Sequence, residues 1–170
     1  MDYRNYLAST TETKKETLDD WRWLIGPQLQ LWFVTKAGDV LLRNSSNDSI
    51  HYLDVTAGIV EQIATSPAHF ESSICDVENA GLWLKPEIVD GQALLDMRPA
   101  KNQCLSFIHP PILGGQIHPD NFEICDILVH LSISGQILRQ VKDLPPGTEI
   151  TDIKIQEPGK SGKRSWWRFW

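Results

Sequence analysis

The sequence predicts an α+β fold, with a mainly antiparallel sheet of about five to six strands and helices packed on it, in a single domain. Three observations lead to this prediction. The chain of 170 residues is long enough to bury one core and matches the usual size of one domain. Its apolar content of 41% and charged content of 22% are ordinary for a globular protein. Runs of strand-forming residues come first, and helices mixed with further strands follow.

The first part of the chain predicts a short helix and then an antiparallel meander. Residues 16–24 place Trp21 and Leu24 on one side of a helix that Pro27 ends. Between the first two strands, a glycine and an aspartate predict a hairpin turn. Three runs of high β-propensity are the strands: residues 29–34, 40–42 and 50–54.

The second part mixes helices with strands. Ser66-Pro67 predicts a helix over residues 67–77, because serine caps free amides and proline fits the first helical turn. Asp126 caps, in the same way, an amphipathic helix that runs to residue 141. The remaining predicted elements are a helical stretch at 82–97 and strands at 103–108, 122–125 and 149–155.

The charge is unevenly distributed along the chain. The formal net charge is −6, yet the last thirteen residues contain four basic residues and no acidic one. The rest of the chain therefore holds twelve basic residues against 22 acidic ones and carries −10. Nucleic-acid binding needs Lys and Arg to displace phosphate counterions, so we expect no direct binding of nucleic acid. An acidic body favours a basic protein partner, or is a plain acidic surface.

The cysteines and the N-terminus indicate a cytoplasmic protein. Cys75, Cys104 and Cys125 are odd in number and widely spaced, so we expect a reducing compartment and no disulfide framework. The first residues lack the basic-then-apolar pattern of a signal peptide. No apolar run approaches the length of a membrane span.

We recognise no catalytic, cofactor-binding or metal-binding constellation, and expect a protein that is not an enzyme. His109, His118 and His130 alternate with Cys104 and Cys125, but their spacing matches no zinc pattern. Both cysteines stand in apolar, strand-like surroundings, where a thiol behaves as an inert hydrophobe. The adjacent glycines Gly114 and Gly115 are not followed by the lysine and the helix of a phosphate-binding loop.

The segment Pro110-Pro111-Ile112-Leu113-Gly114-Gly115 predicts a shaped loop. Prolines cannot donate backbone hydrogen bonds, and glycines adopt backbone angles closed to other residues. One interpretation is a rigid corner between two elements. The other is a partner-binding knob, with Ile112 and Leu113 at an exposed tip. Burial of these two side chains would favour the corner.

We divide the chain into a loose N-terminal segment (1–15), a single α+β domain (16–156) and a flexible basic-aromatic tail (157–170). Interleaved Trp and Lys or Arg suit a membrane interface, and equally a peptide that docks into a partner. A disordered tail, or one folded back on the domain, is the simpler alternative. The candidate partner-binding residues of the tail are Trp166, Trp167, Arg168 and Trp170.

Several motifs occur in order: WFVTKAGDV at 32–40, IHYLDVTAGIVE at 50–61, CLSF before the Pro-Pro-x-x-Gly-Gly loop, SISGQI at 132–137 and LPPGT at 144–148. With these motifs the chain resembles, over roughly residues 21–155, the carboxy-terminal domain of type VI secretion immunity proteins that neutralise a DNase effector. The resemblance implies a bacterial protein whose partner is a protein, a secreted nuclease toxin.

Two functional hypotheses follow. The first is a non-enzymatic immunity-type protein that binds and neutralises a cognate toxin through an acidic surface with aromatic anchors. The second is a peripheral membrane or scaffold-associated protein, recruited by weak contact of its tail with the membrane surface.

Overall fold

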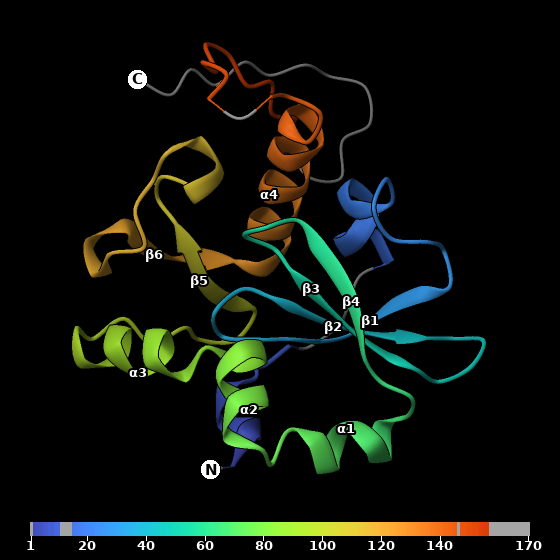
Figure 1. Ribbon diagram of the computed structural model, residues 1–170. Helices are drawn as coiled ribbons and strands as arrows, with labels where there is room; N and C mark the ends of the chain where they lie inside the picture. The colour runs from blue at the N-terminus through green and yellow to red at the C-terminus, as the bar shows by residue number, and fades with distance from the viewer. Residues whose placement is uncertain (1, 11–14, 146, 157–170) are drawn as a thin grey trace.

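The computed structural model describes residues 2–10, 15–145 and 147–156, and its six strands form two antiparallel sheets (Figure 1). The larger sheet has the strand order β1-β2-β3-β4, and the smaller one pairs β5 with β6. The α+β class and the antiparallel pairing are confirmed, whereas the single sheet expected from the sequence is two sheets. The strands are β1 (Leu29–Val34), β2 (Val40–Asn44), β3 (Ile50–Asp54), β4 (Ile59–Ala64), β5 (Gln103–Phe107) and β6 (Phe122–Asp126).

The two sheets meet beside the turn that joins β1 and β2. The N-terminal segment runs along the outer edge of β1, where Ala8 N donates to Val34 O at 2.8 Å and Lys36 N donates to Tyr6 O at 2.7 Å. Lys36 O in turn accepts from Leu105 N of β5 at 2.8 Å. The N-terminal segment and β5 thus both contact the chain where β1 ends, and the β5–β6 hairpin forms a sheet of its own.

One strand was missed and one predicted strand is wrong. The missed strand, β4, is an edge strand with half of its residues exposed, and it lacks the apolar alternation that predicts a strand. Residues 149–155, predicted as the last strand, form no regular element in the described part of the chain. Side chains of the last long helix take up their backbone groups instead: Gln140 Oε1 accepts from Lys154 N at 3.0 Å, and Gln136 Oε1 accepts from Gln156 N at 2.7 Å.

The described helices are α1 (Pro67–Ser73), α2 (Val77–Leu84), α3 (Pro86–Leu94) and α4 (Ile127–Val141), with 3-10 turns η1 (Tyr3–Tyr6), η2 (Lys15–Trp21), η3 (Pro111–Leu113) and η4 (Pro119–Asn121). The predicted caps of Ser66 and Asp126 are confirmed. The helix predicted over 67–77 ends early, because Asp76 caps α2. The stretch predicted over 82–97 divides at Lys85, which is left-handed (φ 49°) before Pro86. The N-terminal helix predicted over 16–24 is the shorter η2.

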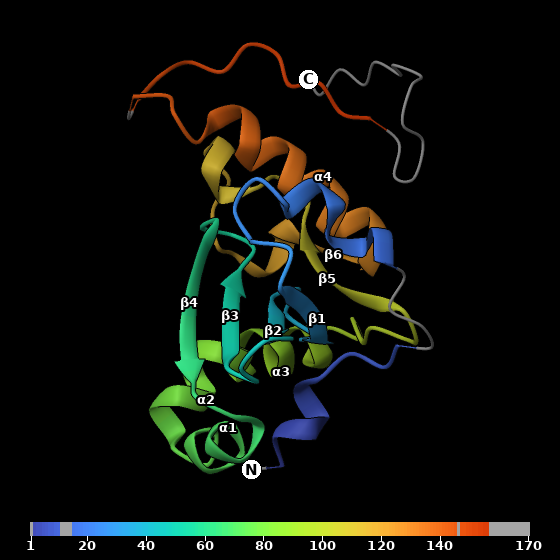
Figure 2. The same cartoon turned by 90° about the vertical axis from the view of Figure 1, so that its right-hand side faces the viewer.

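Helices cover both faces of the larger sheet. Figure 1 shows α4 on one side and α1 and α2 on the other, and Figure 2 shows η2 beside α4. On the α4 side, the buried indole of Trp21 packs in the core and its Nε1 donates to Leu131 O at 2.8 Å. On the opposite side, Phe70 and Trp83 stack with ring centroids 5.9 Å apart. Alternate residues of β2 face the two cores, as the two-residue period of a strand requires.

Two further observations concern the chain as a whole. Across the described ranges, no helix combines the length and the apolarity needed to cross a membrane. The proposed division into a loose start, one domain and a tail stays a prediction, and the tail (157–170) lies outside the described residues.

Candidate functional site

The loop after β5 is shaped by its prolines and glycines. Pro111 opens the single turn of η3, and Gly114 closes it with a φ of 96°, a left-handed conformation that favours glycine. A side chain at Gly115 would overlap the carbonyl oxygen of His109, so the chain passes too close there for any other residue. The sequence therefore specifies this loop by backbone geometry, as predicted.

A clasp of side-chain hydrogen bonds closes the loop. Asn121 Nδ2 donates to the carbonyl oxygens of His109 at 2.8 Å and Gln116 at 2.7 Å, while its Oδ1 accepts from His109 N at 2.8 Å. The ring of His109 donates through Nε2 to Leu113 O at 2.9 Å, because a carbonyl oxygen can only accept. Asn121 of η4 and the ring of His109 thus fix the loop at both ends.

The apolar side chains of this closed loop point outward. Ile112 is 44% exposed and Leu113 is half-buried, while Ile108 and Ile117 on either side are also exposed. A fixed corner and an outward-facing apolar tip therefore occur together, although the sequence interpretation treated them as alternatives. Whether Ile112 and Leu113 bind a partner stays a proposal.

His130 is a buried, neutral histidine beneath the loop. It lines a small cleft between α4 and the loop, together with Ser134, Leu138 and Pro111. Its Nε2 donates to Gly38 O at 3.1 Å, so Nδ1 is the acceptor for the hydroxyl of Ser106 at 2.9 Å. Burial lowers the pKa of His130 to about 4. Both ring nitrogens are used, which leaves neither free for acid–base chemistry or metal binding.

The other candidate chemical groups do not converge. Cys104 and Cys125 face each other across the β5–β6 ladder as free thiols, and burial raises the pKa of both. In the chain outside residues 1, 11–14, 146 and 157–170, no three His, Cys, Asp or Glu side chains gather closely enough to hold a metal ion. His109 and His118 belong to the exposed loop, away from the buried ring of His130.

One buried ion pair joins the sheet to the helical layer. Asp39, at the start of β2, is almost fully buried, and its Oδ2 lies 2.8 Å from Lys85 Nζ. Its Oδ1 accepts from Val55 N at 2.9 Å, and Lys85 Nζ also lies 3.3 Å from Asp54 Oδ2. Burial alone would lower the pKa of Lys85. The carboxylates of Asp39 and Asp54 have the larger combined effect and raise the pKa of Lys85 above its ordinary value. The ammonium group therefore stays charged and holds the α2–α3 junction against the sheet.

The sequence interpretation missed the outer surface of α2 and α3. Four of the nine exposed large apolar residues in the described chain lie there: Val77, Leu82, Leu94 and Leu95. Helical spacing offered a signal, since Glu87, Asp90 and Leu94 recur at intervals of three and four and so share one face. The predicted tail residues Trp166, Trp167, Arg168 and Trp170 lie outside the described residues.

These features define the class of protein. An exposed apolar loop, a second apolar surface on two helices, and buried titratable groups that are already paired suit protein recognition more than catalysis. Residues 64–138 match the family described as T6SS immunity protein Tdi1, C-terminal, where T6SS is the type VI secretion system. This match confirms the resemblance seen in the sequence motifs. It runs from the end of β4 into α4 and covers less than half of the chain. No curated protein matches the chain.

Proposed function

We propose that this protein binds and neutralises a cognate toxin, and that the toxin is a DNase-type effector of a type VI secretion system. The observation that carries the proposal is the match of residues 64–138 to an immunity-protein family. The match covers α1–α3, the β5–β6 hairpin and the closed loop, which together hold seven of the nine exposed large apolar residues in the described chain. The acidic body of the chain fits a basic partner.

Co-expression with a candidate nuclease effector of a type VI secretion system tests the proposal. We expect cells that produce the nuclease alone to lose plasmid DNA and viability, and cells that also produce this protein to keep both. A pull-down from the same cells should recover a stoichiometric complex. Continued DNA degradation together with the absence of a complex would overturn the proposal.

The closed loop is the first surface to probe within that function. We propose that Ile112 and Leu113 contact the toxin, because Ile112 stands on a backbone that is already fixed and loses little entropy on binding. Replacing Ile112 with Asp should weaken the complex about tenfold. Ile59→Asp is the matched control, since Ile59 is similarly exposed but lies on β4. Equal affinities for the two variants would remove the loop from the interface.

The tail supports a second role, contact with a membrane surface. Its sequence alternates Lys or Arg with Trp, the pairing that favours the headgroup region of anionic lipid. We propose that Trp166, Trp167, Arg168 and Trp170 make this contact, or contact the toxin. Sedimentation with phosphatidylserine vesicles, for the full chain and for a chain lacking residues 163–170, separates these outcomes. Equal sedimentation of the two chains would exclude the membrane.

A further inference from the structure

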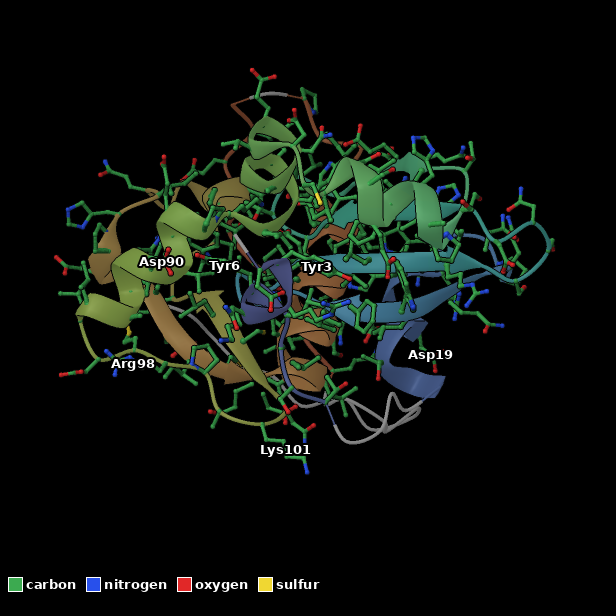
Figure 3. All side chains as sticks on the ribbon, turned by 90° about the horizontal axis from the view of Figure 1, so that it is seen from below. Tyr3, Tyr6, Asp19, Asp90, Arg98 and Lys101 are labelled. Atoms are coloured by element: carbon green, nitrogen blue, oxygen red, sulfur yellow. The ribbon has the colours of Figure 1, made fainter. Side chains whose placement is uncertain are left out.

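The outer face of α2 and α3 is an apolar surface that nothing in the described chain covers. Leu94 is 85% exposed, Val77 79%, Leu82 65% and Leu95 55%. Figure 3 looks onto this helical layer from below and shows Asp90 of α3 pointing toward Tyr6, with an Oδ2–OH distance of 2.9 Å. The opposite sides of the two helices are firmly packed, because they bury Trp83, Leu84 and Val89. The exposed residues therefore stand on fixed helices, and we call this surface the helical face.

Each of the two helices also carries an exposed glycine in its interior. Gly81 lies in α2 and Gly91 in α3, and a Cβ added at either position would meet no atom within 4 Å. Neither glycine has a positive φ. Glycine inside a helix costs stability relative to alanine, so a fold gains nothing from it at an open, ordinary helical position. Both glycines instead leave room for another chain to approach the helix backbone from outside.

The charge around the helical face selects the occupant. Between Arg43 and Arg98 the sequence has nine acidic residues and a single base, Lys85. Lys85 is held by Asp39 and Asp54 on the inner side, so its charge is not presented to solvent as a free cation. The exposed acids of this layer include Glu78 and Glu87 on the helical face itself.

Two arginines near this layer make contacts within the chain and keep their charge. Arg98 donates to Ala93 O at 2.9 Å, and the guanidinium of Arg4 lies 5.1 Å from the centre of the Tyr3 ring. The helical face thus combines exposed apolar side chains with exposed acids, a composition that complements a basic surface which itself carries apolar groups.

We propose that the helical face docks the basic, DNA-contacting surface of the nuclease toxin, an inference that rests on the proposed function. A nuclease needs Lys and Arg to bind phosphates, so its DNA-contacting surface has the complementary charge. An occupant of that surface excludes the substrate, which makes neutralisation a direct consequence of docking. This protein and DNA therefore compete for the same surface of the nuclease.

The first test fills the two open positions. The double variant Gly81→Gln with Gly91→Gln adds two side chains at sites without internal contacts, and glutamine favours the helix more than glycine does. We expect its melting temperature to rise or stay constant, while its Kd for a catalytically inactive form of the candidate nuclease effector rises by about tenfold or more. Wild-type affinity in this variant would overturn the proposal, since a structural role for the glycines predicts a change in stability alone.

A second set of variants tests whether the apolar and acidic side chains of the helical face contribute to binding. Leu82→Ser and Leu94→Ser should each weaken binding, whereas Ile59→Ser on β4 should not. Glu78→Lys with Glu87→Lys should weaken binding and flatten its dependence on salt concentration. A short DNA duplex added to the wild-type complex should displace the protein. Simultaneous binding of DNA and protein to the inactive nuclease would overturn the proposed occupant.

The outcomes separate this inference from the proposed function. If the wild type binds and neutralises the nuclease and the helical-face variants do so equally well, only the helical face is excluded. If the wild type forms no complex at all, the proposed function fails and this inference fails with it. If the wild type is a dimer that Leu82→Ser and Leu94→Ser dissociate, the face holds a second copy of the chain and the proposal is overturned.

Discussion

The α4 layer and the α2–α3 layer differ in what surrounds their glycines. In α4, a Cβ at Gly135 would lie 2.8 Å from Asp20 O and 3.0 Å from Trp21 Nε1, so η2 packs too closely for a side chain. In α2 and α3, Gly81 and Gly91 touch nothing within 4 Å of an added Cβ. The close packing of η2 requires a glycine at Gly135. No contact within the described chain requires one at Gly81 or Gly91. Glycines that serve the fold can thus be separated from glycines that leave space for a partner.

Polar contacts make the same distinction between the two layers. The α4 layer is joined to η2 by hydrogen bonds from its own length: Trp21 Nε1 donates to Leu131 O, and Ser132 Oγ donates to Asp20 Oδ2. The α2–α3 layer is joined to the sheet chiefly at its junction, where Lys85 meets Asp39. Because this ion pair lies at the junction of α2 and α3, on the side that faces the sheet, it leaves the outer sides of both helices free for recognition.

The largest effect is expected at that junction, with Lys85→Met. The variant leaves the carboxylate of Asp39 buried without its cation, which should lower the free energy of unfolding by about 3–5 kcal/mol. Urea denaturation measures the loss. Arg43→Met is the control, because the Arg43–Asp48 pair is exposed and should contribute less than about 1 kcal/mol. Similar losses in the two variants would show that Lys85 does not hold the layer.

The second effect depends on pH and concerns the α4 layer. The pKa of His130 is about 4 in the folded protein and about 6.5 when the ring is exposed in the unfolded chain. Between these values the unfolded state binds the extra proton, so stability is complete above pH 6.5 and falls as the pH drops toward 4. The loss should reach up to about 3 kcal/mol.

Comparison with His130→Gln isolates this contribution from those of the carboxylates. The difference in unfolding free energy between the wild type and the variant should shrink as the pH falls from 6.5 to 4. A difference that stays constant over this range would mean that the ring titrates at its ordinary pKa, and that the α4 layer admits water around it.

The third effect tests the close contact of α4 with η2. Gly135→Ala brings a methyl group against the backbone carbonyl of Asp20, which a side-chain rotation cannot relieve. We expect the free energy of unfolding to fall by about 1–3 kcal/mol, although alanine favours the helix more than glycine. Chemical denaturation measures it. An increase in stability would show that η2 moves aside easily, and the contrast between the two layers would be lost.

Much of the fold could be predicted from local signals. The strands β1–β3 follow from runs of strand-forming residues, and α4 follows from its apolar face and the Asp126 cap. The failures have tertiary causes. β4 is a half-exposed edge strand that exists through pairing with β3. Lys154 and Gln156 bond through their backbone groups to the side chains of Gln140 and Gln136 instead of to a strand. Neither cause is visible in the residues of the segment itself.

One part of the candidate site could be predicted from local sequence, and another part could not. The closed loop could be predicted because prolines and glycines act on the backbone locally, and the structure adds the clasp by Asn121, twelve residues from His109. Gly91 lies within the helical stretch predicted over residues 82–97. Its meaning depends on knowing which side of the helix is buried, and that follows from packing rather than from the local sequence.

The smallest effect is the sharpest test of the comparison. Gly81→Ala and Gly91→Ala should each raise the free energy of unfolding by about 0.5–1 kcal/mol, because alanine reduces the entropy of the unfolded chain and meets no neighbour in the folded one. The two gains should add, since the sites share no contact. Thermal unfolding of both single variants and of the double variant measures them. Opposite signs for these variants and for Gly135→Ala would confirm that the fold needs Gly135 and does not need Gly81 or Gly91. A loss of stability at Gly81 or Gly91 would instead mean that the helix needs glycine there for its own conformation, which would remove the argument that the position was left open for another chain.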